Sequence, residues 1–262
     1  MGRIVRRLRA ATVLAGQQGL RAGLSLVAQD HGGLLGARPL LVLAPHPADE
    51  VLGCGATIAR ARALGNEVRV VLVSDGSAWP PGGDRSAIAD ARFREMVVAC
   101  TRLGVEPGAI THLGLPDGEL PGHEAAVAAG IQPVLDAVDR DRRPVVLATS
   151  AEDPHPDHAL VGRVARRICA DRDLELYEYP IWQWSRPLTW STDLARACRC
   201  GHLVKVSTRG FVVAKEAALA AHASQLVPAL GGPGPGVIGR DFASLFLGAN
   251  EVFVRPELPS PR

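Results

Sequence analysis

Short apolar runs alternate along most of this chain with longer segments of helical character. The run at residues 67–74 has valine or leucine at most positions, which is typical of a strand buried on both faces of a parallel sheet. Three further runs are of the same kind. The predicted strands span residues 40–44, 67–74, 110–113 and 144–149.

Helical segments fill the spaces between these strands. Gly65 and Gly104 each follow such a segment, in the position where glycine commonly ends a helix. Pro133 lies inside another segment and is expected to interrupt it, because proline lacks the N–H of a helical hydrogen bond. The predicted helices span residues 50–64, 86–103, 124–138 and 157–170.

The alternation of strands and helices predicts an α/β fold, with a mostly parallel, Rossmann-like sheet and helices on both of its faces. After Leu174 the pattern is less regular and richer in strands, so we expect a smaller C-terminal β-rich part within a single domain of residues 1–262. Residues 226–240 are too rich in glycine and proline to form a regular element. Either an active-site lid or a plain surface loop accounts for them.

Residues 1–36 are predicted to form an N-terminal helical extension. Apolar residues recur from Ile4 to Val27 at roughly helical spacing, which favours an amphipathic helix packed on the domain. Four arginines before a weak apolar stretch leave a signal peptide or a membrane-surface helix as the alternative. No apolar run reaches the ~18 residues that a membrane-spanning helix needs, and we expect a cytoplasmic protein.

Charge and cysteine content narrow the function only slightly. The formal net charge of +2 at pH 7 argues neither for nor against nucleic acid. The five cysteines are odd in number and irregularly spaced, so buried, reduced thiols are expected rather than a disulfide framework. Cys198 and Cys200, with His202 close by, suggest a second zinc site, but no other cysteine pair completes the usual four ligands.

Two segments with the chemistry of a metal site follow predicted strands. His-Pro-Ala-Asp-Glu occupies residues 46–50 after the first strand, and His-Pro-Asp-His occupies residues 155–158 after the fourth. Because ligands of open α/β sheets bind outside the carboxyl ends of the strands, we expect the two segments to meet. His46, Asp49 and His158 would supply two nitrogens and one carboxylate oxygen, the three-ligand set of a catalytic Zn²⁺ that keeps a fourth position for water.

Two histidines and one carboxylate also form the facial triad of non-haem Fe(II) oxygenases. Those sites keep three positions open for oxygen and a cosubstrate. Here the candidate ligands lie on strand-to-helix turns, and a further histidine, His155, lies beside the last of them. This arrangement favours hydrolysis, and iron-dependent oxygenation stays as the alternative.

The two segments resemble the signature of the PIG-L (LmbE-like) family of zinc-dependent N-deacetylases, which carries His-Pro-Asp-Asp-Glu after its first strand and His-x-Asp-His later. Three further stretches resemble the same family: Leu-Gly-Leu-Pro-Asp-Gly at residues 113–118, Arg-x-x-Glu at 92–95 and the helix at 215–225. The resemblance covers roughly residues 40–255. The chain departs from the pattern at Ala48, which stands where the family has its first Asp.

The resemblance implies roles for the remaining residues of the two segments. His155 is left off the metal, to donate to the oxyanion and protonate the leaving amine, while Asp157 holds and charges that imidazole. The family's first Asp takes a proton from metal-bound water, which Ala48 cannot do. Three explanations stay open: an engineered variant without its base, a natural chain with weak or no activity, or another base. Glu50 is the candidate for another base, although the start of a helix favours a capping role for it.

Arg92 and Asp117 are the candidates for substrate contacts, since their family counterparts lie near the polar substrate. The alternatives are a solvated helix charge for Arg92 and a turn residue for Asp117. Five of the eleven aromatic residues of the chain lie in one short segment and suggest either a wall for a sugar or acyl chain or core packing beneath a loop. They are Tyr177, Tyr179, Trp182, Trp184 and Trp190.

The sequence therefore predicts a Zn²⁺-dependent hydrolase that removes an N-acyl group, most simply N-acetyl, from an amino sugar or glycoconjugate. We expect its activity to be impaired, because Ala48 replaces the general base. The expected partner is the small-molecule substrate, with no nucleic acid and no membrane span. The main alternative is a non-catalytic, sugar-binding descendant of the same family.

Overall fold

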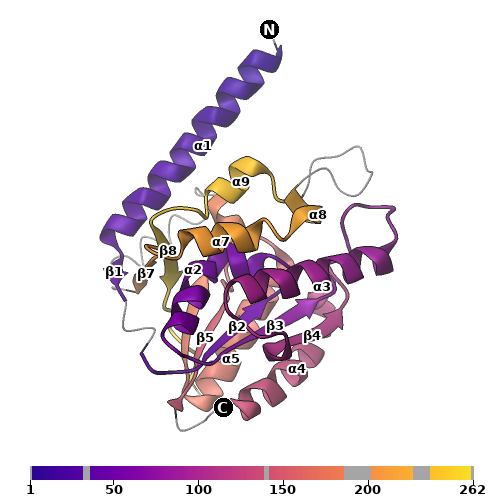
Figure 1. Cartoon of the computed structure of the whole chain (residues 1–262), viewed down its shortest axis with the longest axis vertical. Coiled ribbons are helices and arrows are strands. Elements are labelled where there is room, and N and C mark those ends of the chain that lie inside the picture. The colour runs from indigo at the N-terminus through magenta and orange to yellow at the C-terminus, as the bar shows by residue number, and fades with distance from the viewer. Residues whose placement is uncertain (1, 32–35, 139–141, 186–201, 227–236, 261–262) are drawn as a thin grey trace.

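A single eight-stranded sheet organises the molecule, as a computed structural model shows (Figure 1). The structure describes residues 2–31, 36–138, 142–185, 202–226 and 237–260, with the side chains of residues 2–12 left aside. The strand order is β1-β7-β8-β6-β5-β2-β3-β4. The strands are β1 (Gln29–Asp30), β2 (Leu40–Ala44), β3 (Val68–Ser74), β4 (Ile110–Leu115), β5 (Val145–Thr149), β6 (Glu175–Tyr179), β7 (Leu203–Ser207) and β8 (Asn250–Val254).

Most neighbouring strands run parallel, which confirms the predicted fold class. Strand β2 pairs in parallel with β3 on one side and with β5 on the other. The chain therefore reverses its direction of travel across the sheet between β2 and β5, and such a switch point is where α/β folds bind ligands. The C-terminal strands extend this same sheet, with β8 antiparallel to both β6 and β7.

Helices cover both faces of the sheet because the central strands are apolar on both faces. In β2, Leu40 and Val42 pack into one buried cluster, while Leu41 and Leu43 pack into the cluster on the opposite face. The first cluster includes residues of α2 and α3, and the second includes residues of α4 and α5. The α-helices include α2 (Asp49–Ala63), α3 (Arg85–Arg102), α4 (Glu124–Ala137), α5 (Pro156–Arg172), α7 (Val212–Leu219), α8 (Ala223–Leu226) and α9 (Arg240–Ser244). Two short 3₁₀ helices are η3 (Leu120–His123) and η5 (Trp182–Ser185).

Two helices differ from their predictions. The late helix expected at residues 215–225 is divided, because α7 ends at Leu219 and α8 begins at Ala223. Helix α4 continues through Pro133, so the expected interruption there was wrong. Proline fixes φ near the helical value and removes only one hydrogen bond, and here four residues of helix follow it.

The N-terminal helix α1 (Gly2–Val27) is packed on the domain through its C-terminal half. Leu24 is buried there, and Arg21 donates to the carbonyl of Asn250 at 3.0 Å while lying over the ring of Trp184. The N-terminal half extends away from the sheet (Figure 1). None of the helices in the described ranges combines the length and the hydropathy that crossing a membrane requires.

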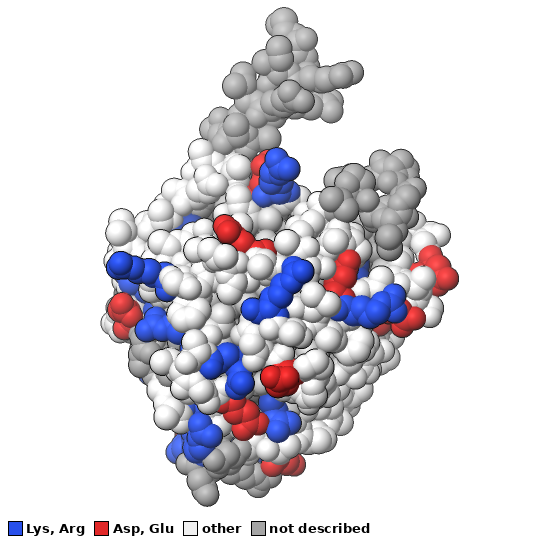
Figure 2. All heavy atoms as spheres, in the orientation of Figure 1, with Lys and Arg blue, Asp and Glu red and all other residues white. Residues whose placement is uncertain are grey.

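Charge is mixed on the face of the molecule that Figure 2 displays. Basic and acidic side chains of the described residues are interspersed there and do not gather by sign. This distribution agrees with the small formal net charge of +2.

Candidate metal centre

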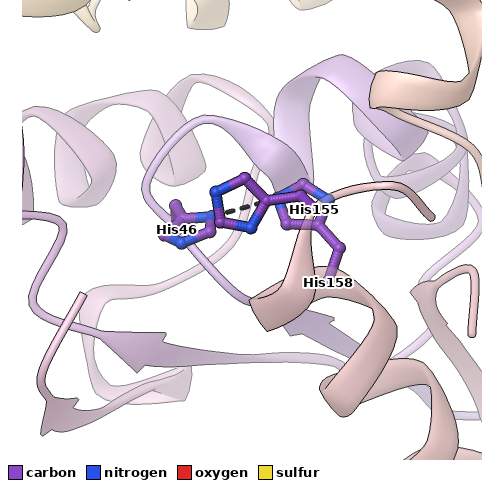
Figure 3. A group of neighbouring side chains, drawn as sticks. All are labelled: His46, His155 and His158. Carbon is purple, nitrogen blue, oxygen red and sulfur yellow. Dashed lines mark hydrogen bonds between the residues drawn. The ribbon is translucent and has the colours of Figure 1, made fainter. Parts of the chain in front are cut away.

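The two motif segments meet at the carboxyl ends of β2 and β5, the adjacent strands at the switch point. Residues 46–50 leave β2 and enter α2, and residues 155–158 form the start of α5. Figure 3 shows the three histidines of these segments facing one another. Their ring centroids lie 4.9–5.0 Å apart.

Three donor atoms of the predicted ligand set converge on one point. His46 Nδ1 lies 3.0 Å from His158 Nε2, and Asp49 Oδ2 lies 3.3 Å from each of these nitrogens. Donor atoms in a tetrahedral zinc site lie about 3.3 Å apart when each is about 2.0 Å from the metal. The triangle therefore has the size that such a site requires.

Two other triads of side chains also come within metal-binding range of each other. His155 joins His46 and His158 in one, and Asp117 and Asp157 join His46 in the other, with ligand atoms within 4.8 Å. The first of these triads has no carboxylate and the second has only one histidine, whereas the triangle combines two histidines with a carboxylate. We therefore take the triangle as the candidate ligand set and the remaining residues as its surroundings.

The electrostatics of the cluster fit a bound cation. Burial lowers the pKa of His46, but hydrogen bonds to Asp117, Asp157 and Asp49 outweigh that effect and raise it well above 6.5. A positive charge is thus stabilised at the point where three carboxylates gather. Metal binding displaces protons from its ligands, so a divalent ion can take the place of this proton.

His158 fits the role of a neutral ligand. Burial is the main cause that lowers its pKa to about 3. Its Nε2 is one corner of the triangle, while its Nδ1 is buried without a hydrogen bond within the described part of the chain. A carboxylate atom, Asp153 Oδ1, lies 3.8 Å from that Nδ1.

The sequence did not identify Asp153 as a functional residue. Its side chain accepts hydrogen bonds from the amides of His155 at 2.9 Å and Trp182 at 3.1 Å. Burial raises its pKa to about 7. Its position two residues before the second motif was the one signal that could have singled it out, because metal-bound histidines usually donate their second N–H to a carboxylate.

The structure places Asp157 differently from the sequence-based expectation. Its Oδ2 atom accepts from His46 Nε2 at 3.1 Å and from the Gly118 amide at 2.8 Å, and Oδ1 accepts from the Leu120 amide at 3.1 Å. His155 is bonded instead to the backbone N–H of Asp157, which donates to His155 Nδ1 at 3.3 Å. In the neutral ring this leaves the proton on Nε2 of His155. Burial, followed by the charge on His46, lowers the pKa of His155.

Ala48 is buried beside the triangle in a left-handed backbone conformation, with φ of 91°. That conformation costs an L-residue with a Cβ about 1–2 kcal/mol, and Asp and Asn are the non-glycine residues that adopt it most readily. The turn is thus better suited to the family's Asp than to alanine. Glu50 does not reach the cavity: its two carboxylate oxygens bond to the Ala48 amide at 2.9 Å and to His222 Nε2 at 3.0 Å.

Arg92 and Asp117, the predicted substrate residues, both line the cavity beside the triangle. The guanidinium of Arg92 donates to the carbonyls of Gly76 and Trp79, while its Nε is buried without a partner among the described residues. Arg92 is therefore not a solvated helix charge. Burial opposes ionisation of Asp117, but hydrogen bonds from His46 and from the Ala78 amide contribute to a pKa of about 2.

The aromatic residues divide between the core and the cavity. Tyr177 and Tyr179 are fully buried, and Trp184 is almost so. Trp182 lines the cavity and stacks on Phe242 with ring centroids 4.8 Å apart. The predicted aromatic wall is thus Trp182 joined by Phe242, whereas Trp190 lies outside the described residues.

The predictions for the cysteines and for residues 226–240 can be compared with the structure only where it describes those residues. Cys54, Cys100 and Cys169 are free, buried thiols, as expected, and burial raises the pKa of each. The second zinc hypothesis rests on Cys198 and Cys200, which lie outside the described residues. So does most of the segment at residues 226–240, although Val237 and Ile238 line the cavity.

Comparison with known proteins connects this geometry with a family. Residues 41–169 match the family described as "PIG-L: GlcNAc-PI de-N-acetylase". A 1D-myo-inositol 2-acetamido-2-deoxy-alpha-D-glucopyranoside deacetylase of Mycobacterium avium is 32% identical over 246 residues, which cover 72% of this chain and 80% of that protein. The chain belongs to the PIG-L family. The family predicted from the sequence is thereby confirmed.

Some other relatives of this PIG-L chain match over less of their length. The deacetylase of the same description from Streptomyces avermitilis is 36% identical over 154 residues, which are 50% of this chain and 52% of that protein. The chain thus spans about half the length of that relative.

Solved structures agree on the fold. The conserved protein TT1542 of Thermus thermophilus is 27% identical, with a TM-score of 0.58 over 85% of this chain and 96% of that one. The N,N'-diacetylchitobiose deacetylase of Pyrococcus horikoshii is 22% identical, with a TM-score of 0.57 over 75% of this chain and 73% of that one. At that identity the second likeness speaks for the fold alone.

Proposed function

We propose that this PIG-L chain is built to hydrolyse an N-acetyl group on an amino sugar or glycoconjugate, with Zn²⁺ bound by His46, Asp49 and His158. The observation that carries this proposal is the convergence of their donor atoms within 3.0–3.3 Å of one another. The named relatives act on a 2-acetamido-2-deoxy sugar, which supports the substrate class. The family also favours hydrolysis over the iron-dependent alternative.

The bound metal would polarise the amide carbonyl and make hydroxide available near neutral pH. His155 would stabilise the oxyanion: it lines the cavity, and the backbone amide bonded at Nδ1 leaves its Nε2–H to donate. To protonate the leaving amine, His155 would first have to take up a second proton at Nδ1, because a neutral imidazole that gives up its Nε2 proton becomes an anion. Arg92 and Asp117 line the cavity and would hold the polar part of the sugar.

The missing component is a base for the attacking water. Ala48 lines the cavity next to the ligand triangle but has no group that accepts a proton. Glu50 is fully buried with both oxygens bonded, which supports a structural role for it. We infer that the chain binds metal and substrate but turns over slowly. Ala48 also favours the second candidate, a PIG-L chain that binds sugars without hydrolysing them.

A four-way assay tests both candidates. The chain and its Ala48→Asp variant are each compared in Zn²⁺-loaded and chelator-treated form, and acetate release is measured from a panel of N-acetylated amino sugars and glycosides. Zinc-dependent hydrolysis by Ala48→Asp, with much slower hydrolysis by the parent, supports the proposal. Tight sugar binding by both proteins without any hydrolysis supports the binding protein instead, and hydrolysis unaffected by chelation contradicts the metal assignment.

A further inference from the structure

A single peptide group between two candidate ligands is held at both of its polar atoms. The carbonyl of Pro47 accepts a hydrogen bond from Gln225 Nε2 at 3.1 Å. The N–H of the same peptide unit belongs to Ala48 and donates to Glu50 Oε2 at 2.9 Å. Side chains, rather than neighbouring strands or helical turns, therefore bond both ends of this peptide.

His222 connects the two side chains that hold this peptide. Its Nε2 lies 3.0 Å from Glu50 Oε1, and its Nδ1 lies 3.5 Å from Gln225 Nε2. Because the NH₂ group of Gln225 only donates, Nδ1 of the ring accepts from it, and the ring then carries its proton on Nε2 and donates to Glu50. Glu50 and His222 are 0% exposed and Gln225 is 3% exposed. Together they close a buried ring of hydrogen bonds around the Pro47–Ala48 peptide.

This ring holds the peptide group that lies between His46 and Asp49. Rotation of the Pro47–Ala48 peptide changes ψ of Pro47 and φ of Ala48, two of the torsions that lie between the two ligands. The φ of Ala48 is 91°, a value that residues with a Cβ rarely adopt unless surrounding contacts hold the backbone there. Contacts from Gln225 on α8, and from His222 in the turn between α7 and α8, supply that support.

Helix α8 is itself anchored from the other side of the site. Ser224 donates its amide and its hydroxyl to the carboxylate of Glu95 on α3, at 2.8 and 2.6 Å. The backbone carbonyl of Gln225 accepts from the amide of Ile238, a residue that lines the cavity. These bonds give a structural reason for Glu95 in the Arg-x-x-Glu stretch and for Ser224.

The geometry points to His222 and Gln225 as positioning residues of the metal centre, an inference that rests on the proposed metal-binding function. Neither bonds to a donor atom of the candidate ligands. They act through one peptide group whose orientation sets the distance between His46 and Asp49. Losing such an outer contact typically weakens metal affinity about 10–100-fold.

Metal affinity, rather than turnover, is the direct readout. Gln225→Met keeps the size of the side chain and removes the donor to Pro47. We expect its Zn²⁺ dissociation constant, measured by competition with a chromogenic chelator, to rise about 10-fold or more. The absorption spectrum of bound Co²⁺ should change as well, because it reports the geometry of the ligands.

Gln183→Met is the matched control. Gln183 is also a buried glutamine, 2% exposed, and its side-chain amide has no hydrogen-bond partner in the part of the chain that the structure describes. We expect Zn²⁺ affinity close to that of the parent. His222→Gln adds a second test, since an amide can still donate to Glu50 and should retain more affinity than His222→Ala. Thermal midpoints of the metal-free proteins show whether each variant is folded.

The outcomes separate this inference from the proposed function. Failure of the parent itself to bind Zn²⁺ overturns the metal centre. Tight binding by the parent and unchanged affinity in Gln225→Met and His222→Ala overturns the positioning role alone. Equal losses of affinity in Gln225→Met and Gln183→Met also overturn it, because the effect would then follow any lost buried amide.

Discussion

The Oδ2 atom of Asp157 lies 3.1 Å from the Nε2 atom of His46, on the far side of the ring from the other two candidate ligands. The same carboxylate accepts hydrogen bonds from the amides of Gly118 and Leu120. It therefore joins the loop after β4 to a candidate metal ligand. This is the second-carboxylate arrangement that orients metal-bound histidines in many proteins.

Asp157→Asn is predicted to weaken metal binding rather than only slow the reaction. An amide keeps one acceptor oxygen but sets an NH₂ group against one of the donors that now surround the carboxylate. We expect Zn²⁺ affinity to fall about 10–100-fold, as for other outer partners of metal-bound histidines. Chelator competition measures it, with Asp173→Asn as a control at an exposed aspartate. Unchanged affinity combined with lower turnover would restore the role in which Asp157 serves His155.

His46→Ala and His158→Ala are predicted to abolish stoichiometric metal binding. Each removes one of three donors, and two remaining donors do not complete a protein zinc site. Elemental analysis after purification and dialysis measures the metal content. His123→Ala is the control, because His123 lies in η3 outside the metal-binding groups of the described residues. A full complement of metal in both ligand variants contradicts the assignment.

Ala48→Asp is predicted to raise turnover by at least about 10²-fold, since a positioned general base contributes about 10²–10⁴. Metal content should change little. Ala48→Asn is the matched control, because Asn suits the left-handed turn equally well but cannot accept the proton. Activity in Ala48→Asp alone indicates base catalysis. Equal activation by both variants indicates that relief of backbone strain is the cause, and equal rates in all three proteins indicate a different base.

His155→Ala, made together with Ala48→Asp, is predicted to lower turnover about 10²–10⁴-fold, the range for a positioned acid. Zinc content should stay the same, because His155 Nδ1 is held by a backbone amide and the ring is not one of the three closest donors. Kinetics and elemental analysis on the same samples decide between the roles. Loss of zinc with this change means that His155 and His158 have exchanged roles.

Lys215→Met is predicted to destabilise the fold by about 3–5 kcal/mol, the typical cost of breaking a buried ion pair. Lys215 is 0% exposed and lies 2.6 Å from Glu251, whose carboxylate also accepts from the amides of Ala56 and Thr57. These amides follow a break in α2 at Cys54, where φ is −143°. Urea unfolding measures the loss.

The same experiment with a second change tests the reason for that loss. Adding Glu251→Gln to Lys215→Met removes the unpaired buried charge while keeping an acceptor for the helix amides. We therefore expect the double variant to regain part of the lost stability. A double variant less stable than Lys215→Met would show that the charge of Glu251 stabilises α2 without its partner.

The local sequence was sufficient for the strands of the central sheet and for the edge on which the site lies. Leu40–Ala44 forms a strand because its residues are apolar on both faces, and that pattern is visible without any structure. The convergence of the two motif segments follows from strand order in a parallel sheet. The departure at Ala48 is likewise evident from the residue alone.

Only the tertiary structure decided which partner each polar group takes. Asp157 turns to His46 because the amides of Gly118 and Leu120, contributed by a different loop, bind its carboxylate in that position. Asp153 reaches towards His158, and Gln225 reaches Pro47 across more than 170 residues of sequence. Hydrogen bonds of this kind depend on distances between elements brought together by packing, and no periodicity along the chain encodes them.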